Sequence, residues 1–113
     1  MIRGLVPLLV LFLWTAPASA MSLDQYEEMK KSDWAKTYVF GVGQGFLWAN
    51  AEQANKNAPP FYCQSPKVAL TADNYLQILN DSIEKRRASS KYDKGFPIEG
   101  LLMMALQEAF PCK

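Results

Sequence analysis

The sequence contains no histidine in its 113 residues. Histidine is the commonest general base and the commonest metal ligand, so its absence excludes Ser-His-acid catalysis and most zinc sites. Paired carboxylates, such as Glu27 with Glu28 or Asp81 with Glu84, remain as acid–base candidates. They lie in segments rich in lysine and arginine, where a solvated helix face is the expected role. We therefore expect no enzyme, no metal site and no cofactor.

A surplus of charge is also missing. The 12 lysine and arginine residues are balanced by 11 aspartate and glutamate residues, and the formal net charge is +1. Proteins that bind nucleic acids usually carry a basic surplus that neutralises phosphates. The composition therefore predicts no nucleic-acid partner.

No hydrophobic run reaches the roughly 20 residues needed to cross a bilayer. The longest, Leu5–Trp14, follows Arg3 and precedes Ala18-Ser19-Ala20, and this order is typical of a cleaved secretory signal peptide. A retained membrane anchor is the alternative, but the hydrophobic run is shorter than such an anchor needs. We predict a signal peptide over residues 1–20 with cleavage after Ala20, a periplasmic location without a stable membrane anchor, and one domain over residues 21–113.

Cysteine is scarce, since only Cys63 and Cys112 occur, both in the region predicted to be exported. Thiols of exported proteins are normally oxidised, and two cysteines allow one intramolecular pairing. That bridge would close a loop of about 50 residues and stabilise the fold by roughly 4 kcal/mol in the chain-entropy model. An intermolecular bridge or two free reactive thiols are the alternatives.

Local signals predict helices in the first half of the exported chain. Ser22 to Gln25 form a capping box that starts a short helix through about Lys31. Ser32-Asp33 is a second cap, after which a longer helical pattern runs to about Lys56. The segment Asn55–Pro60 then stops the helix, because its two prolines cannot continue it.

Local signals also predict helices in the second half of the exported chain. Thr71 is a good N-cap for a helix that ends in basic residues up to Arg87, and Pro97 occupies a typical first position of the last helix, which stops at Pro111. The apolar positions of these two helices are Tyr75, Leu76, Ile78, Leu79, Ile83, Ile98, Leu101, Leu102, Ala105, Leu106 and Ala109. No segment alternates like a half-buried strand. The sequence predicts an all-α fold, a small single domain of four (or four to five) helices stapled by one disulfide.

One stripe of the long helix combines aromatic residues with glycines. Trp34, Tyr38, Gly41, Gly45 and Trp48 recur at intervals of three and four, so we expect them to be buried together, with a small-molecule pocket as the alternative for the aromatic residues. Glycine costs about 1 kcal/mol relative to alanine in a helix, which is tolerated where another backbone approaches closely. We predict that Gly41 and Gly45 pack a tight helix crossing, inside the domain or at a dimer seam. A phosphate loop lacks the required strand and lysine.

The most loop-like stretch carries arginines, a tyrosine and small flexible residues, a composition enriched where proteins bind proteins. A solvated linker is the alternative. The predicted partner-binding residues are Arg86, Arg87, Ser89, Ser90, Lys91, Tyr92, Asp93 and Lys94.

Four segments follow one another in a recognisable order. They are Tyr38–Gly45 on the long helix, Phe61–Pro66 after it, Leu70-Thr71 at the next helix and Ala105–Cys112 at the end. Together they resemble the Rap1a/Tai family of periplasmic immunity proteins, which protect bacteria with type VI secretion from cell-wall-degrading toxins. The match covers most of residues 34–112.

Members of that family are small, helical, exported and often dimeric, with a disulfide between the matched cysteines. The resemblance therefore implies a Cys63–Cys112 bridge, a homodimer and a cognate secreted effector, such as a peptidoglycan amidase or other cell-wall hydrolase. Our hypothesis is a stoichiometric toxin inhibitor whose Arg86–Lys94 loop covers the active site of the effector. A periplasmic stress or chaperone-like helical protein is the alternative.

Overall fold

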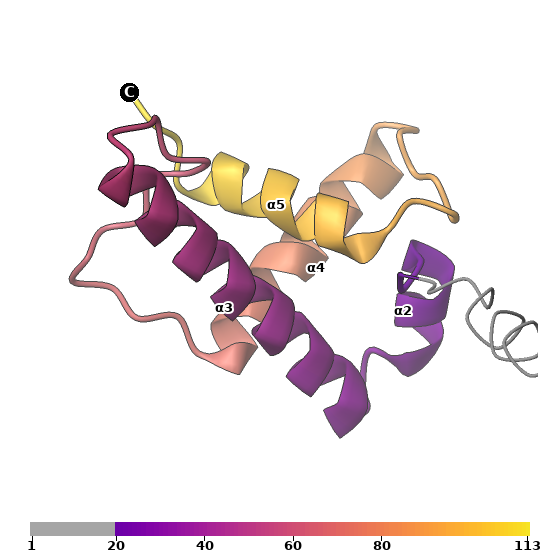
Figure 1. Ribbon diagram of the computed structural model, residues 1–113. Coiled ribbons are helices and arrows are strands. Elements are labelled where there is room, and N and C mark those ends of the chain that lie inside the picture. The colour runs from indigo at the N-terminus through magenta and orange to yellow at the C-terminus, as the bar shows by residue number, and fades with distance from the viewer. Residues whose placement is uncertain (1–19) are drawn as a thin grey trace, which may run out of the picture.

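The computed structural model describes residues 20–113, so most of the predicted signal peptide lies outside the described residues. Four helices make up this part of the chain: α2 (Leu23–Met29), α3 (Asp33–Asn55), α4 (Ala72–Ala88) and α5 (Ile98–Ala109). It contains no strand, only an isolated antiparallel bridge between Ser22 and Pro97. α4 and α5 lie side by side and α3 crosses them (Figure 1). The prediction of a small all-α fold of four helices is confirmed.

The helix starts follow from local hydrogen bonds. The Ser22 hydroxyl accepts from the Gln25 backbone N–H at 3.2 Å, and the Gln25 side-chain oxygen accepts from the Ser22 N–H at 3.0 Å. Ser32 caps α3 by accepting from the backbone N–H of Ala35, and Thr71 forms a capping box with Asn74 at the start of α4. Each cap satisfies backbone donors that a helix start leaves unpaired, so the predicted starts are confirmed.

The core lies where the helices meet. Its largest fully buried side chains come from all four helices and from the segment after α3: Tyr26, Tyr62, Tyr75, Leu23, Leu79, Ile83, Ile98, Leu102, Leu106 and Val39. The hydroxyl of Tyr26 donates to the Asn80 side-chain oxygen at 2.7 Å, which satisfies its buried polar group and joins α2 to α4.

The predicted buried stripe of α3 is wrong, because its two tryptophans face outward. Trp34 is 56% exposed and Trp48 is 74% exposed. An added Cβ at Gly41 or Gly45 would meet nothing within 4 Å, so neither glycine packs a helix crossing inside the domain. Their role at a dimer seam stays a prediction.

The close approach occurs instead at Gly43, on the opposite face of α3. Ala35, Val39 and Gly43 are the buried residues of this helix. A Cβ at Gly43 would lie 2.5 Å from the ring of Tyr75 on α4. Small side chains line this face because α4 leaves no room for larger ones. The helix crossing therefore uses a glycine, but not the glycines that we predicted.

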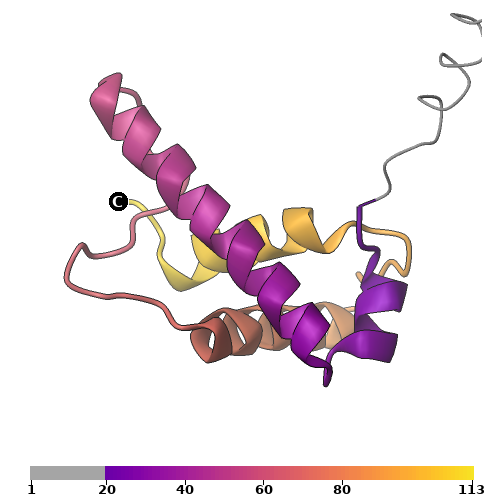
Figure 2. The ribbon, with the colours of Figure 1, turned by 60° about the horizontal axis from the view of Figure 1, so that its bottom comes forward.

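A disulfide fixes the segment between α3 and α4. Cys63 is bonded to Cys112 beyond α5, with a Cα–Cα distance of 5.0 Å and a sequence separation of 49 residues. The backbone N–H of Cys63 also donates to the carbonyl of Phe110 at 2.8 Å. The second half of α3 projects past α4 and α5, and the disulfide holds the returning segment against the end of α5 (Figure 2). The predicted intramolecular bridge is confirmed.

Candidate binding surface

The predicted partner-binding segment starts with two arginines that already have partners within the chain. Arg86 forms an ion pair with Glu108 of α5 at 3.1 Å, and Arg87 forms one with Glu27 of α2 at 2.9 Å. The guanidinium of Arg87 also lies 4.6 Å from the centre of the Tyr92 ring, a cation–π contact. These contacts tie the end of α4 to α2 and α5.

The rest of this segment divides into structural and exposed residues. Tyr92 is half-buried against the core, and the Asp93 carboxylate accepts from the Gly95 backbone N–H at 3.0 Å. The remaining side chains face solvent: Ser89, Ser90, Lys91 and Lys94. A hollow of about 90 Å³ lies beside Lys91 and Asp93. Partner binding by this segment stays a prediction, and its arginines and tyrosine contribute to the fold.

A second surface runs along α3, and we call it the outer face: Trp34, Gly41, Gly45 and Trp48. The ring of Trp34 stacks on Tyr38 with centroids 5.4 Å apart. Tyr38 is held in turn, because its hydroxyl donates to Glu99 of α5 at 2.8 Å. Desolvation and this contact raise the pKa of Tyr38, so the hydroxyl stays protonated. The outer face therefore presents an oriented tryptophan beside helix backbone that the two glycines leave uncovered.

Beside the outer face lies a groove of about 870 Å³, which we call the α3–loop groove because the second half of α3 and the segment after it form its walls. None of its lining residues carries a charge. They are Gln44, Leu47, Trp48, Asn50, Ala51, Ala54, Pro60, Tyr62, Cys63, Gln64, Ser65, Pro66, Val68, Ala69 and Leu70. Such a concave and mostly apolar surface is typical of a binding site.

Exposed hydrophobic residues gather at this groove. Residues 20–113 contain five large hydrophobic side chains that are exposed, and Leu47, Trp48 and Val68 among them line the groove. Phe61 adjoins the lining residue Tyr62, and Trp34 alone lies elsewhere, on the outer face. Clustered exposed apolar surface marks interaction sites in soluble proteins, whereas scattered residues do not.

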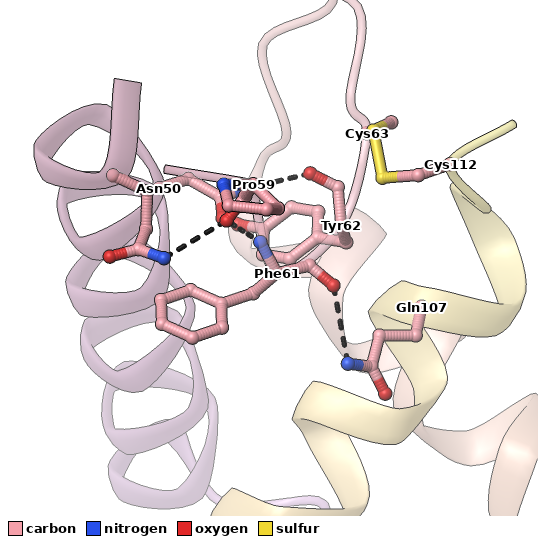
Figure 3. Close-up of a disulfide and its surroundings, with 8 residues drawn as sticks. Asn50, Pro59, Phe61, Tyr62, Cys63, Gln107 and Cys112 are labelled. Atoms are coloured by element: carbon pink, nitrogen blue, oxygen red, sulfur yellow. Dashed lines mark hydrogen bonds between the residues drawn. A yellow bond between two sulfur atoms is a disulfide. The ribbon is translucent and has the colours of Figure 1, made fainter. Parts of the chain in front are cut away.

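The far wall of the groove is held from two sides. The amide of Asn50 on α3 donates to the carbonyl of Tyr62 at 2.9 Å and accepts from the backbone N–H of Phe61 at 2.8 Å. Gln107 of α5 donates to the carbonyl of Phe61 at 3.2 Å. Figure 3 shows these contacts next to the Cys63–Cys112 disulfide. These contacts anchor residues 61–63, where the segment enters the groove wall.

Two polar atoms of the groove residues lack partners. Tyr62 is 1% exposed, and its hydroxyl has no hydrogen bond. Burial raises the pKa of Tyr62 to about 12, so this hydroxyl is neutral and can donate. The side-chain oxygen of Gln64 is also buried without a partner, while its nitrogen donates to the Val68 carbonyl at 2.7 Å. Buried unpaired groups are uncommon in folded proteins.

Sequence reasoning put Trp48 in a buried stripe and Tyr62 in the segment after the long helix, and it missed the groove that both residues line. Asn50 is the residue that a closer reading could have singled out, since it is a polar amide in an apolar helical stretch. Its two partners, however, lie after two prolines and cannot be identified from spacing alone.

Comparison with known proteins adds no identification. No protein-family model matches the chain, and no curated protein or solved structure is significantly similar to it. Within residues 20–113, no group of three histidine, cysteine or acidic residues could hold a metal ion, and no helix is long and apolar enough to cross a membrane.

Proposed function

We propose that the protein is an exported immunity protein of the Rap1a/Tai type, without enzymatic activity, that binds a cognate type VI secretion effector and blocks its cell-wall hydrolase site. The order of the family motifs and the intramolecular disulfide support this proposal. The observation that carries it is the outer face of α3, where two exposed tryptophans flank two uncovered glycines.

The outer face has the size and chemistry of a protein-binding patch. Trp34 and Trp48 lie about 21 Å apart along the helix, comparable with the width of a standard interface of roughly 800 Å² per partner. Tryptophan is enriched among the residues that dominate binding energy. Gly41 and Gly45 leave the helix backbone open, so a partner can approach it more closely than it could approach side chains.

The outer face replaces the Arg86–Lys94 segment as the primary contact in this proposal. The segment and the projecting end of α3 lie at opposite ends of the domain (Figures 1 and 2). Arg86 and Arg87 would have to leave their ion pairs before binding an effector, whereas Trp34 and Trp48 are exposed already. A large effector that reached both ends would use the exposed Lys91 and Lys94 as a second contact.

The test is calorimetric titration with a cell-wall hydrolase encoded beside this gene. Gly45→Arg adds a long side chain to the outer face without meeting another atom, so the fold should persist. The matched control is Gln77→Arg, which adds the same side chain to an exposed position of α4. We expect Gly45→Arg and Trp34→Ala each to weaken binding at least about 30-fold, as at an interface hot spot, with Gln77→Arg unchanged.

Two outcomes would count against the proposal. Failure of the unaltered protein to bind or inhibit the hydrolase would remove the immunity function. Binding that survives Gly45→Arg but is lost when the exposed Lys91 and Lys94 are both changed to alanine would return the interface to the loop. Sedimentation of the same variants also tests the proposed homodimer.

A periplasmic stress or chaperone-like protein is the second candidate. The exposed apolar side chains at the α3–loop groove favour it, because a chaperone that holds unfolded clients needs such a surface. This candidate predicts that the protein suppresses aggregation of several unrelated unfolded clients. An immunity protein would bind one folded effector and leave that aggregation unchanged.

A further inference from the structure

We propose that the α3–loop groove, which shares Trp48 with the outer face, is a second binding site for an uncharged amphiphilic ligand with an apolar body and one hydrogen-bonding end group. The site stands on three observations: its lining carries no charge, its walls are held in place, and the buried Tyr62 hydroxyl and Gln64 oxygen lack partners.

The lining selects against ions. An ionised group that enters the groove loses its hydration and finds no opposite charge there, which is strongly unfavourable. Apolar walls from Leu47, Trp48 and Leu70 favour a hydrocarbon or aromatic body instead. The volume of about 870 Å³ falls within the range of small-molecule sites, roughly 300–1,000 Å³.

A peptide fits the groove less well. An extended peptide would bury a backbone donor and acceptor at each residue, and every such group needs a partner. Asn50 and Gln64 each already donate one N–H to a backbone carbonyl, which leaves few side-chain donors for a second backbone. The apolar face of a helix would satisfy its own backbone but leave the Tyr62 hydroxyl and the Gln64 oxygen unpaired. A hydroxyl or amide end group both donates and accepts, so it can pair with either atom once that side chain turns toward the groove.

Trp48 reports on the site directly, since it lines the groove and is 74% exposed. The chain has three tryptophans, so replacing Trp14 and Trp34 with phenylalanine in the full-length chain leaves Trp48 as the single tryptophan. The probes are 1-octanol, octanoate and octylammonium at pH 7, which share one chain and differ in charge. We expect saturable changes in Trp48 emission with 1-octanol, and at least about tenfold weaker binding of both ions.

Substitutions separate the groove from the rest of the surface. Ala51→Phe fills the groove from an exposed position of α3 and should abolish the 1-octanol signal. Thr37→Phe adds the same ring to the same helix outside the groove and should leave the signal unchanged. Val68→Asp places a charge in the lining and should weaken 1-octanol while strengthening octylammonium. Tyr62→Phe should weaken 1-octanol about fivefold through the lost hydrogen bond.

The proposal is overturned if 1-octanol gives no saturable signal, if the three probes bind equally, or if binding survives both Ala51→Phe and Val68→Asp. An amphipathic helical peptide of leucine and lysine serves as a further probe. Saturable binding of this peptide without binding of 1-octanol would also overturn the proposal, since it would make the groove a helix-docking site. None of these measurements needs an effector, so they stand or fall independently of the immunity function.

Discussion

Replacing Gly43 with alanine should destabilise the fold, although alanine is the better helix former. The added Cβ would lie 2.5 to 2.7 Å from three ring carbons of Tyr75, closer than such atoms approach in folded proteins. Tyr75 cannot easily withdraw, because it is fully buried and its hydroxyl donates to Gln44 at 3.2 Å. Overpacking of this kind costs up to about 3 kcal/mol, and the gain in helix propensity returns about 1 kcal/mol. We expect a net loss of about 2 kcal/mol.

The same substitution at two neighbouring glycines provides the control. Gly41→Ala and Gly45→Ala add a methyl group to open space, so each should raise the free energy of unfolding by about 0.5–1 kcal/mol. Urea unfolding of the disulfide-intact protein, followed by circular dichroism, measures all three differences, and the melting temperature of Gly43→Ala should fall by about 10 °C. The reasoning is refuted if Gly43→Ala is as stable as Gly41→Ala or Gly45→Ala.

Two further predictions concern the disulfide and the buried tyrosines. Changing Cys63 and Cys112 to serine should lower the free energy of unfolding by roughly 4 kcal/mol, because the open chain gains the entropy of a 49-residue loop, and unchanged urea midpoints would contradict this. Burial raises the pKa of Tyr26 and of Tyr62 to about 12. Above pH 10 the unfolded chain therefore loses protons that the folded protein keeps. Stability should be constant up to about pH 10 and then fall by about 1.4 kcal/mol per pH unit for each tyrosine up to about pH 12. Urea unfolding between pH 9 and 12 checks this slope.

The helices were predictable because their determinants are local. A capping residue and its partner lie three positions apart, as in Ser22 with Gln25, so the sequence places them without knowledge of the tertiary fold. The prolines that end the long helix act in the same local way. The bridge between Cys63 and Cys112 was predictable for another reason, since two cysteines in a chain that is predicted to be exported have one intramolecular pairing.

The face of α3 was not predictable from hydrophobicity. Trp34 and Trp48 make one side of the helix the more apolar, and hydrophobicity alone predicts that this side is buried. The close approach of α3 to α4 decides which side of α3 is buried. Gly43 lies against the ring of Tyr75, where there is no space for a large side chain. Gly43 therefore enters the core, whereas Trp34 and Trp48 remain outside. A pattern of alanine, valine and glycine at intervals of four was the available signal.

The groove depends on contacts between distant parts of the chain. Asn50 reaches Phe61 and Tyr62 across two prolines, and Gln107 reaches Phe61 from the last helix. Neither contact follows from residue spacing, since each joins segments whose relative position is set by the whole fold. The interaction residues of the Arg86–Lys94 segment were chosen on composition, and composition does not reveal that Arg87 already pairs with Glu27.

The outer face and the groove arise from one feature of α3. Because this helix packs with Ala35, Val39 and Gly43, Trp34, Leu47 and Trp48 are left on its exposed side, and its second half extends beyond the other helices. Trp48 belongs to both surfaces, and at 74% exposure it adds little to the free energy of folding. A fold that needed only stability would be served as well by a charged residue at this position. The exposed tryptophan is therefore best explained by binding, and changing it should affect partners more than stability.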